Sequence, residues 1–302
     1  MIWGHKLHTH THSYIHYGYY KGFSHLGYET FWLDAQDDVS EIDFSSTLFL
    51  TEGQVDQGIP LRNDCTYVLH NCDLSKYCNK ISQNKIIKLN VYFKACEYRD
   101  TKKMAPYVFY NLEDRSIYMP WATDLLPHEI QAYQQELNFS SQRDKTAIFV
   151  GSCAGTTAYS NLSEIENFRR ACTDHQFRFI VVGGYGNASG FIGINSNIAL
   201  IQESFLAPAI QGPWQCGVGY IPCRIFKNIS YGKLGITNNE TVYDLFEGRV
   251  IYNPDCYQLF LDAMHAMSGD YRDLLLWQMN FVCQNHTYLN RIDCLMRLIE
   301  AC

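Results

Sequence analysis

The sequence contains no run of apolar residues that approaches the roughly 20 needed to cross a bilayer, and its first residues lack the apolar core of a signal peptide. Charged residues are also scarce, at 18% of the 302 residues, and they give a formal net charge of −7. A general nucleic-acid binder needs a basic face, so this charge predicts that nucleic acid is not a partner. With 47% hydrophobic residues the chain is still globular, and its length suits two domains of roughly 150 residues each.

The twelve cysteines include no Cys-x-x-Cys pair, so neither a zinc ribbon nor a dense disulfide scaffold is indicated. Six Asn-x-Ser/Thr sequons are present, and the one at Asn228 falls inside a predicted helix, where a glycan would be poorly accommodated. We therefore expect a reducing, cytoplasmic location in which these sequons are not used.

Short apolar strands alternate with helical segments along the whole chain, which is typical of parallel β-α-β units. The strands expected in the first half are 1–7, 30–33, 47–50, 66–70 and 86–93, with a helix over 17–26. Those expected in the second half are 146–150, 177–182, 234–237 and 250–252, with helices over 164–173 (Ser163 as N-cap), 241–246, 254–267 and about 272–299, and a mixed helix–strand passage over 194–203. A polar stretch from 131 to 145 separates the halves, and we place the domain boundary after residue 135.

The most informative segment runs from Gly219 to Asn239. Pro222 suits the first turn of a helix, where its missing N–H costs nothing, and Gly232 suits the position that ends the helix. The unpaired amides of the helix start and the guanidinium of Arg224 together make a receptor for phosphate. An ordinary helix–strand unit with a surface arginine is the alternative.

Two loops with small residues follow predicted strands in the second half. Gly151 and Ser152 lie in the first loop, and Gly184 and Tyr185 lie in the second, which lacks the Gly-x-Gly-x-x-Gly spacing of dinucleotide-binding folds. Ligands of open α/β sheets bind at the carboxyl ends of the strands. We therefore expect these loops to contact a phosphate or a sugar, with plain turns as the alternative.

Five of the eleven histidines fall within the first sixteen residues. Alternating histidines at a strand end would face one way, which suits a metal site. The His8-Thr9-His10-Thr11 sequence resembles the opening of the PHP-type and amidohydrolase metal phosphoesterases, but no Asp-x-His follows near the C-terminus. A metal centre, a solvated histidine-rich turn, and a loop that offers a base or a polar contact to substrate all remain open.

The chain as a whole resembles the GT-B glycosyltransferases. The features that carry the resemblance are two successive β-α-β halves, the Phe149-Val150-Gly151-Ser152 opening of the second half, and Tyr220-Ile221-Pro222-x-Arg224-x-Phe226 with Tyr231-Gly232 before Thr237-Asn238-Asn239. The resemblance implies an α/β fold of two Rossmann-like domains that face each other. Residues 1–135 would bind the acceptor and residues 136–302 the nucleotide-sugar, with the final helix able to pack back on the first domain.

The activity implied by this resemblance is transfer of a hexose or pentose from a UDP- or GDP-linked sugar to a glycan or another hydroxyl acceptor. It implies no bound metal and no other cofactor, and no Asp-x-Asp metal motif is present. The implied phosphate-binding residues are Arg224, Lys227, Asn228, Gly151, Ser152, Ser204, Tyr220 and Pro222. The implied sugar-binding residues are Gly184, Tyr185, Asn238 and Asn239. A glutamate that is often found in the donor helix is absent around Lys227 and Asn228, and the side-chain amide of Asn228, Asn238 or Asn239 could replace it.

An inverting enzyme also needs a base for the acceptor hydroxyl, whereas a retaining enzyme does not, and the sequence leaves both open. His12 or His10, in the loop after the first strand, has a suitable intrinsic pKa. Asp34, which ends the second strand, is the next candidate. A non-catalytic nucleotide- or glycan-binding module and a histidine-rich metal-dependent hydrolase are the alternative functions.

Overall fold

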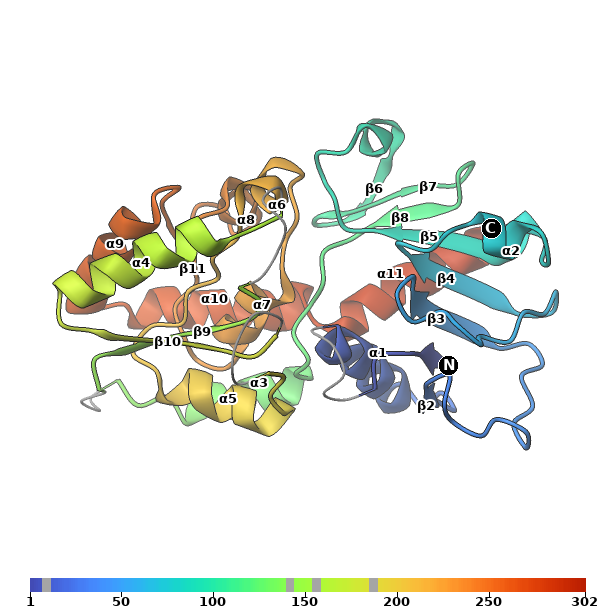
Figure 1. Cartoon of the computed structure of the whole chain (residues 1–302), viewed down its shortest axis with the longest axis horizontal. Coiled ribbons are helices and arrows are strands. Elements are labelled where there is room, and N and C mark those ends of the chain that lie inside the picture. Colours follow the sequence, from blue (N-terminus) through green and yellow to red (C-terminus); the bar gives the residue numbers. More distant parts are fainter. Residues whose placement is uncertain (7–11, 140–143, 154–158, 185–189) are drawn as a thin grey trace. The chain divides into compact units, whose positions relative to one another are not determined.

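The computed structural model describes residues 1–6, 12–139, 144–153, 159–184 and 190–302. Within these ranges the chain forms two compact units (Figure 1). Unit 1 comprises Met1–Val91, Cys96–Pro120 and Tyr288–Cys302, and unit 2 comprises Tyr92–Ala95 and Trp121–Thr287. The division thus follows Pro120, so the helix α3 (Pro127–Gln135) belongs to unit 2 and the last helix, α11 (Tyr288–Ala301), to unit 1.

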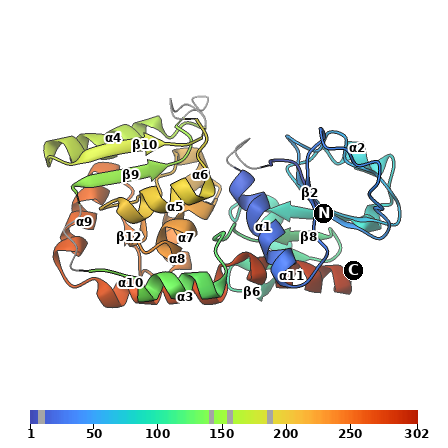
Figure 2. The ribbon, with the colours of Figure 1, turned by 90° about the horizontal axis from the view of Figure 1, so that it is seen from below.

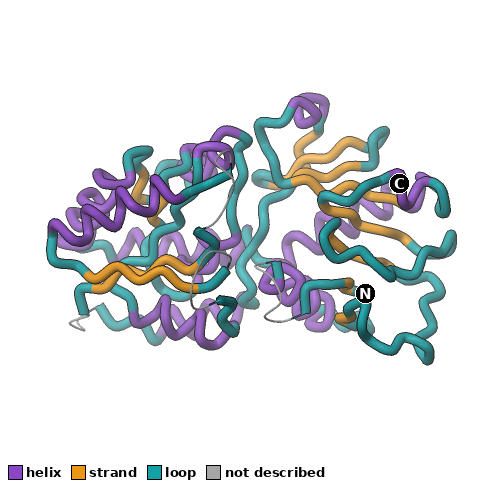
Figure 3. The backbone as a smooth tube through the Cα atoms, in the orientation of Figure 1, coloured by secondary structure: helices purple, strands orange, loops and turns teal. Residues whose placement is uncertain are grey.

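In the described part of unit 1, one sheet has the strand order β2-β1-β3-β4-β5-β8-β7-β6. Figure 3 shows these strands side by side. The parallel strands are β1 (Ile2–Trp3), β2 (Trp32–Leu33), β3 (Leu48–Glu52), β4 (Thr66–His70), β5 (Ile86–Asn90) and β8 (Ser116–Tyr118). Two antiparallel strands, β7 (Val108–Asn111) and β6 (Lys102–Ala105), complete the edge. Parallel strands bring their carboxyl ends to one edge of the sheet, and the candidate side chains of this unit lie there.

The helices α1 (Ser13–His25) and α11 pack against each other in unit 1 (Figure 2). Glycines permit this close approach, because a Cβ at Gly18 would lie 2.2 Å from the ring of Tyr288 and a Cβ at Gly22 would lie 2.7 Å from Ile292. Gly27 follows α1 with φ +85°, a conformation that glycine adopts readily at the end of a helix. The short helices α2 (Ser75–Cys78), η1 (Gln83–Lys85) and η2 (Cys96–Asp100) lie in the connections between strands.

In the described part of unit 2, the parallel strands form pairs, and a further segment of the chain joins one pair to the other. β9 (Thr146–Val150) pairs with β10 (Arg178–Val182), and β11 (Ile236–Thr237) pairs with β12 (Ile251–Tyr252). Residues 206–209 link the pairs through parallel bridges to β9 and β11. Figure 1 shows α4 (Leu162–Asp174) on one face of the β9–β10 pair and α5 (Ile194–Glu203) on the other. The predicted α/β class with mainly parallel strands is confirmed.

The remaining helices of unit 2 are α6 (Pro213–Gly217), α7 (Cys223–Ser230), α8 (Glu240–Leu245), α9 (Cys256–Ser268) and α10 (Arg272–Asn285). Within the ranges that the structure covers, none of the helices combines the length and apolar character that crossing a membrane requires.

Several expected details differ. α4 begins at Leu162 with Asn161 as its N-cap residue, so Ser163 is inside the helix, and α5 is helical throughout. The predicted run 272–299 is two helices, because the chain turns at His286, whose carbonyl accepts a hydrogen bond from the N–H of Thr123 at 3.0 Å.

Candidate functional site

The helix α7 ends just before Gly232, as its sequence predicts, but it begins one residue later than expected, so Pro222 precedes the first turn instead of lying in it. Pro222 is the N-cap residue in an extended conformation, and Gly232 follows the helix with φ +91°. The Gly232 N–H donates to the carbonyl of Ile229 at 2.9 Å, and the Lys233 N–H donates to that of Asn228 at 3.0 Å. This is the paired hydrogen-bond pattern of a glycine-terminated helix, and it fixes the direction in which α7 presents its first turn.

Arg224 occupies that first turn and is held by backbone carbonyls. Its Nε donates to the carbonyl of Val150 at 2.6 Å, at the carboxyl end of β9, and its Nη1 donates to that of Ile210 at 3.0 Å. The guanidinium also lies 4.1 Å over the ring of Phe149. Burial lowers the pKa of Arg224. Across the described parts of the chain, no carboxylate lies within ion-pair distance of it. The guanidinium therefore has hydrogen-bond partners, but no negative charge neutralises its positive charge.

The two glycine loops are built for close approach at this edge of the sheet. A Cβ at Gly151 would lie 1.9 Å from Nη2 of Arg224, so only glycine leaves room for the guanidinium. A Cβ at Gly184 would lie 2.6 Å from Oγ of Ser152, so the loops after β9 and β10 meet there. The structure therefore brings Gly151, Ser152, Gly184 and Arg224 to the same strand ends, whereas Tyr185 lies outside the described residues.

Lys227 lies one turn beyond Arg224 and is 6% exposed. Burial lowers the pKa of its ammonium, and the nearby carboxylate of Asp124 counteracts this. That carboxylate also accepts a hydrogen bond from the hydroxyl of Tyr231 at 2.6 Å. The first two turns of α7 thus carry two basic side chains, and the carboxylate of Asp124 lies near the second, Lys227. A net positive charge beside the helix N-terminus is suited to an anion such as a diphosphate.

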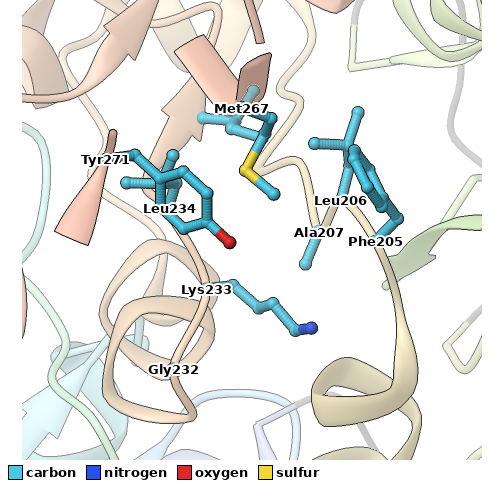
Figure 4. A pocket seen from close by; sticks show the side chains of 9 residues that line it. Phe205, Leu206, Ala207, Gly232, Lys233, Leu234, Met267 and Tyr271 are labelled. Carbon is cyan, nitrogen blue, oxygen red and sulfur yellow. The ribbon is translucent and has the colours of Figure 1, made fainter. Parts of the chain in front are cut away.

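Two other predicted phosphate-binding residues make hydrogen bonds inside unit 2. Nδ2 of Asn228 donates to the carbonyl of Ala207 at 2.8 Å, and the hydroxyl of Ser204 donates to that of Ile201 at 2.7 Å. Lys233 Nζ donates to the carbonyls of Gln202 and Ser204, and Figure 4 shows its side chain beside a small pocket between the 205–207 segment and the residues that follow α7. With a volume of about 10 Å³ this pocket holds one water at most, so it is a packing feature.

The predicted sugar-binding amides are joined by Gln211, which the sequence did not indicate. Asn238 accepts the N–H of Gln211 at 2.9 Å and donates to its carbonyl at 2.8 Å. Nδ2 of Asn239 donates to the side-chain oxygen of Gln211 and to the carbonyl of Tyr220, both at 2.8 Å. Asn239 also accepts the N–H of Thr241 at the start of α8. These amides organise the backbone next to Arg224.

Tyr220 also contributes its side chain to this region. Its hydroxyl accepts a hydrogen bond from Nε1 of Trp121 at 3.0 Å, and burial raises the pKa of the phenol. Tyr220 is therefore a neutral group at physiological pH.

A second polar cluster lies at the carboxyl edge of the unit 1 sheet. Nε2 of His5 lies 2.8 Å from the carboxylate of Glu52, and the two residues are 2% and 3% exposed. The ring of His12 stacks on that of His5 with centroids 5.3 Å apart, and it lies 6.1 Å from the ring of His70. Glu52 ends β3 and was not singled out from the sequence, although a carboxylate at the end of an apolar strand was a usable signal.

His70, which ends β4, is neutral. Its Nδ1 bonds to the carbonyl of Leu89 at 3.0 Å, and its Nε2 lies 3.1 Å from the side-chain amide of Asn71. A ring that donates from Nδ1 accepts at Nε2, and burial lowers the pKa of this imidazole. The imidazoles next to Glu52 thus include one that burial holds in its unprotonated form.

The other base candidates are placed differently. Asp34 follows β2 and accepts the backbone N–H of Lys6 at 3.0 Å, while Lys6 Nζ contacts Asp37 at 2.5 Å. His10 lies outside the described residues. Within the ranges covered by the structure, no three side chains of the types that ligate metals are arranged to hold an ion. The metal-free reaction stays a prediction.

No protein-family profile and no curated protein sequence matches the chain. Among solved structures it is similar to an alpha-glucosyltransferase in complex with UDP and a 13-mer DNA containing a central A:G mismatch. The TM-score is 0.68 at 8% sequence identity, over 99% of this chain and 98% of that chain. At this identity the similarity shows the fold alone, which is that of a glycosyltransferase over the full length.

This comparison corrects one prediction. The net charge of −7 predicts that nucleic acid is not a partner, but the similar glucosyltransferase is bound to DNA. The exclusion is therefore wrong. Its physical weakness is that net charge sums over the whole chain, whereas a nucleic acid contacts only one face.

Proposed function

We propose that the chain is a glycosyltransferase that takes a sugar from a nucleotide-sugar bound by unit 2 and passes it to a hydroxyl acceptor bound by unit 1. The observation that carries this proposal is Arg224, a partly buried cation in the first turn of α7 whose guanidinium donates to the carbonyls of Val150 and Ile210. An uncompensated guanidinium beside helix amides fits a diphosphate, which is the part common to UDP- and GDP-linked sugars. The full-length fold similarity to a UDP-bound glucosyltransferase supports the same reading.

Sugar transfer breaks the bond between the anomeric carbon and a phosphate oxygen, which leaves negative charge on the diphosphate. Arg224 and the α7 amides stabilise that charge where it develops, without rearranging. The acceptor oxygen forms the new bond and loses its proton. If the reaction inverts the anomeric centre, His12 takes this proton as general base, stacked on His5, which Glu52 holds.

The proposal includes a hexose or pentose donor, the facing GT-B arrangement of the two units, and turnover without a bound metal. The acceptor is proposed only as a hydroxyl group. Because the similar glucosyltransferase is bound to DNA, the acceptors tested should include duplex DNA as well as oligosaccharides.

A thermal-shift screen with UDP, GDP, CMP and their sugars tests the donor. A ligand at one hundred times its Kd stabilises the folded state by about 2.7 kcal/mol, which raises the Tm measurably. We expect UDP or GDP to raise the Tm and CMP not to do so. If no nucleotide shifts the Tm, the proposal is wrong.

Turnover of the matching nucleotide-sugar, with and without excess EDTA, separates the alternatives. We expect release of the nucleoside diphosphate in both conditions. Binding without turnover would favour a non-catalytic binding module, and activity lost with EDTA but restored by a divalent ion would contradict the proposed metal-free transfer.

A further inference from the structure

The carbonyl that holds Nη1 of Arg224 belongs to the peptide group between Ile210 and Gln211. Both polar atoms of this planar group, the carbonyl oxygen and the amide nitrogen, make hydrogen bonds. Its carbonyl accepts from Arg224 at 3.0 Å, and its N–H donates to Oδ1 of Asn238 at 2.9 Å. Because the peptide is rigid, fixing its N–H also fixes the direction of its carbonyl.

Asn238 holds this peptide with both ends of its amide. In addition to accepting the N–H of Gln211, it donates to the carbonyl of Gln211 at 2.8 Å, so its side chain pairs with the backbone as a neighbouring strand would. Gln211 is 1% exposed, and its side chain is bonded to Asn239 and to the carbonyl of Tyr220. A rotation of this peptide would break the Asn238 bonds and remove the acceptor from Arg224.

We propose that Asn238 is a positioning residue, which sets the guanidinium plane of Arg224 for the donor diphosphate through the Ile210–Gln211 peptide. This replaces the expectation that Asn238 contacts the donor sugar, and it rests on the proposed function. The hydrogen bond to Val150 fixes Nε of Arg224, and the bond to Ile210 fixes Nη1. Two bonds define the plane and the direction in which the remaining N–H groups point, since the guanidinium is flat.

The test compares the affinities of UDP and uridine, measured by calorimetry, in wild type and Asn238→Ala. Uridine lacks the diphosphate, so a change that misplaces Arg224 weakens UDP but not uridine. We expect Asn238→Ala to weaken UDP roughly tenfold and uridine less than twofold. Asn238→Asp keeps the acceptor for the Gln211 N–H. Its UDP-to-uridine affinity ratio should therefore lie between those of wild type and Asn238→Ala. If the alanine variant does not fold, this aspartate variant provides the measurement. Equal weakening of UDP and uridine would mean that Asn238 only supports the fold.

Gln278 supplies a matched control in the same unit. It is 0% exposed and makes the same kind of clamp, because it accepts the N–H of Gly235 at 2.9 Å and donates to the carbonyl of Arg249 at 2.7 Å. Gln278→Ala should lower the Tm about as much as Asn238→Ala does, yet leave the UDP-to-uridine affinity ratio unchanged. A similar loss of that ratio in Gln278→Ala would overturn the assignment.

A double-mutant cycle with Arg224→Ala completes the test, because residues that act through one another are not additive. Asn238→Ala should have no further effect on UDP affinity once Arg224 is removed. If Arg224→Ala weakens UDP and the two losses add, the positioning role is wrong but the donor site stands. If wild type and Arg224→Ala bind UDP equally, both the donor site and this inference fail.

Discussion

Unit 1 and unit 2 both end their parallel strands in polar side chains, but the two edges carry different chemistry. The edge of unit 1 gathers the rings of His5, His12 and His70 near the carboxylate of Glu52. The edge of unit 2 carries Arg224, whose charge does not change at physiological pH. Under the proposed function, the same strand-end geometry serves proton transfer in unit 1 and anion binding in unit 2.

The difference depends on what partners each buried group has. In unit 1 the carboxylate of Glu52 has an imidazole nitrogen of His5 as its partner, at 2.8 Å. In unit 2 two carbonyls solvate Arg224 without cancelling its charge. A cation satisfied in this way keeps its attraction for an anionic ligand. Residue type alone does not decide whether a buried charge binds a ligand, because the partner matters as much.

The largest expected effect is a loss of turnover when a base is removed from the edge of unit 1. His12→Ala should lower kcat by about 10²-fold or more and leave UDP affinity near wild type, because it removes a base and not a donor contact. Steady-state kinetics and calorimetry measure the two effects. His25→Ala, at the exposed C-terminal end of α1, is the matched control and should keep full activity. Full activity in both His12→Ala and His10→Ala would place the base elsewhere, with Asp34 next.

The reverse pattern is expected at the edge of unit 2. Arg224→Ala should weaken UDP by one to two orders of magnitude, since a charge-assisted hydrogen bond contributes about 1.5–3 kcal/mol. Arg224→Lys should recover only part of this affinity, because an ammonium cannot make the flat two-point contact. Far-UV circular dichroism should stay unchanged. Arg178→Ala, an exposed arginine on β10, is the control. Equal UDP affinity in wild type and Arg224→Ala would show that the edge of unit 2 does not bind the diphosphate through Arg224.

A smaller effect is expected from the glycine beside Arg224. Gly151→Ala puts a methyl group where Nη2 now lies, so the guanidinium must shift and UDP affinity should fall about tenfold. The Cβ of Gly217→Ala would meet no atom within 4 Å, so this variant should bind UDP as wild type does. If Gly151→Ala binds UDP normally, the guanidinium is not confined as the structure indicates.

The smallest expected effect is a pH dependence of stability at the edge of unit 1. Burial lowers the pKa of His70 in the folded protein, so the unfolded chain binds a proton more readily below its ordinary pKa of about 6.5. Stability from the neutral ring is therefore present above about pH 6.5 and is lost as the pH falls toward the folded value. The slope contributed by one group is at most about 1.4 kcal/mol per pH unit.

Urea denaturation between pH 8 and pH 5 measures this dependence. His70→Gln, which cannot titrate, should flatten the loss of unfolding free energy below pH 6.5. Equal slopes in wild type and His70→Gln would show that other groups dominate the acid destabilisation.

The elements predicted best are those whose signal is local. β4 and β9 match the expected ranges, because short apolar runs bounded by polar residues mark buried parallel strands. The hairpin of β6 and β7 was missed, since both strands are four residues long and β6 begins with two exposed lysines, Lys102 and Lys103. The split between α10 and α11 was missed as well, because no proline or glycine marks the turn at His286.

The residues of the candidate site also divide into those that the sequence indicated and those that only the folded structure brought together. The sequence by itself determined where α7 lies, from Pro222 before it and Gly232 after it, and it placed Arg224 near the start of the helix. This was possible because capping and helix termination depend on residues a few positions apart. The tertiary structure decided what Arg224 contacts, through the carbonyls of Val150 and Ile210, 74 and 14 positions away in the chain. It likewise brought Glu52 to His5 and Gln211 to Asn238. Every residue has a backbone carbonyl, so a partner of that kind leaves no mark in the sequence, and only the folded chain selects it.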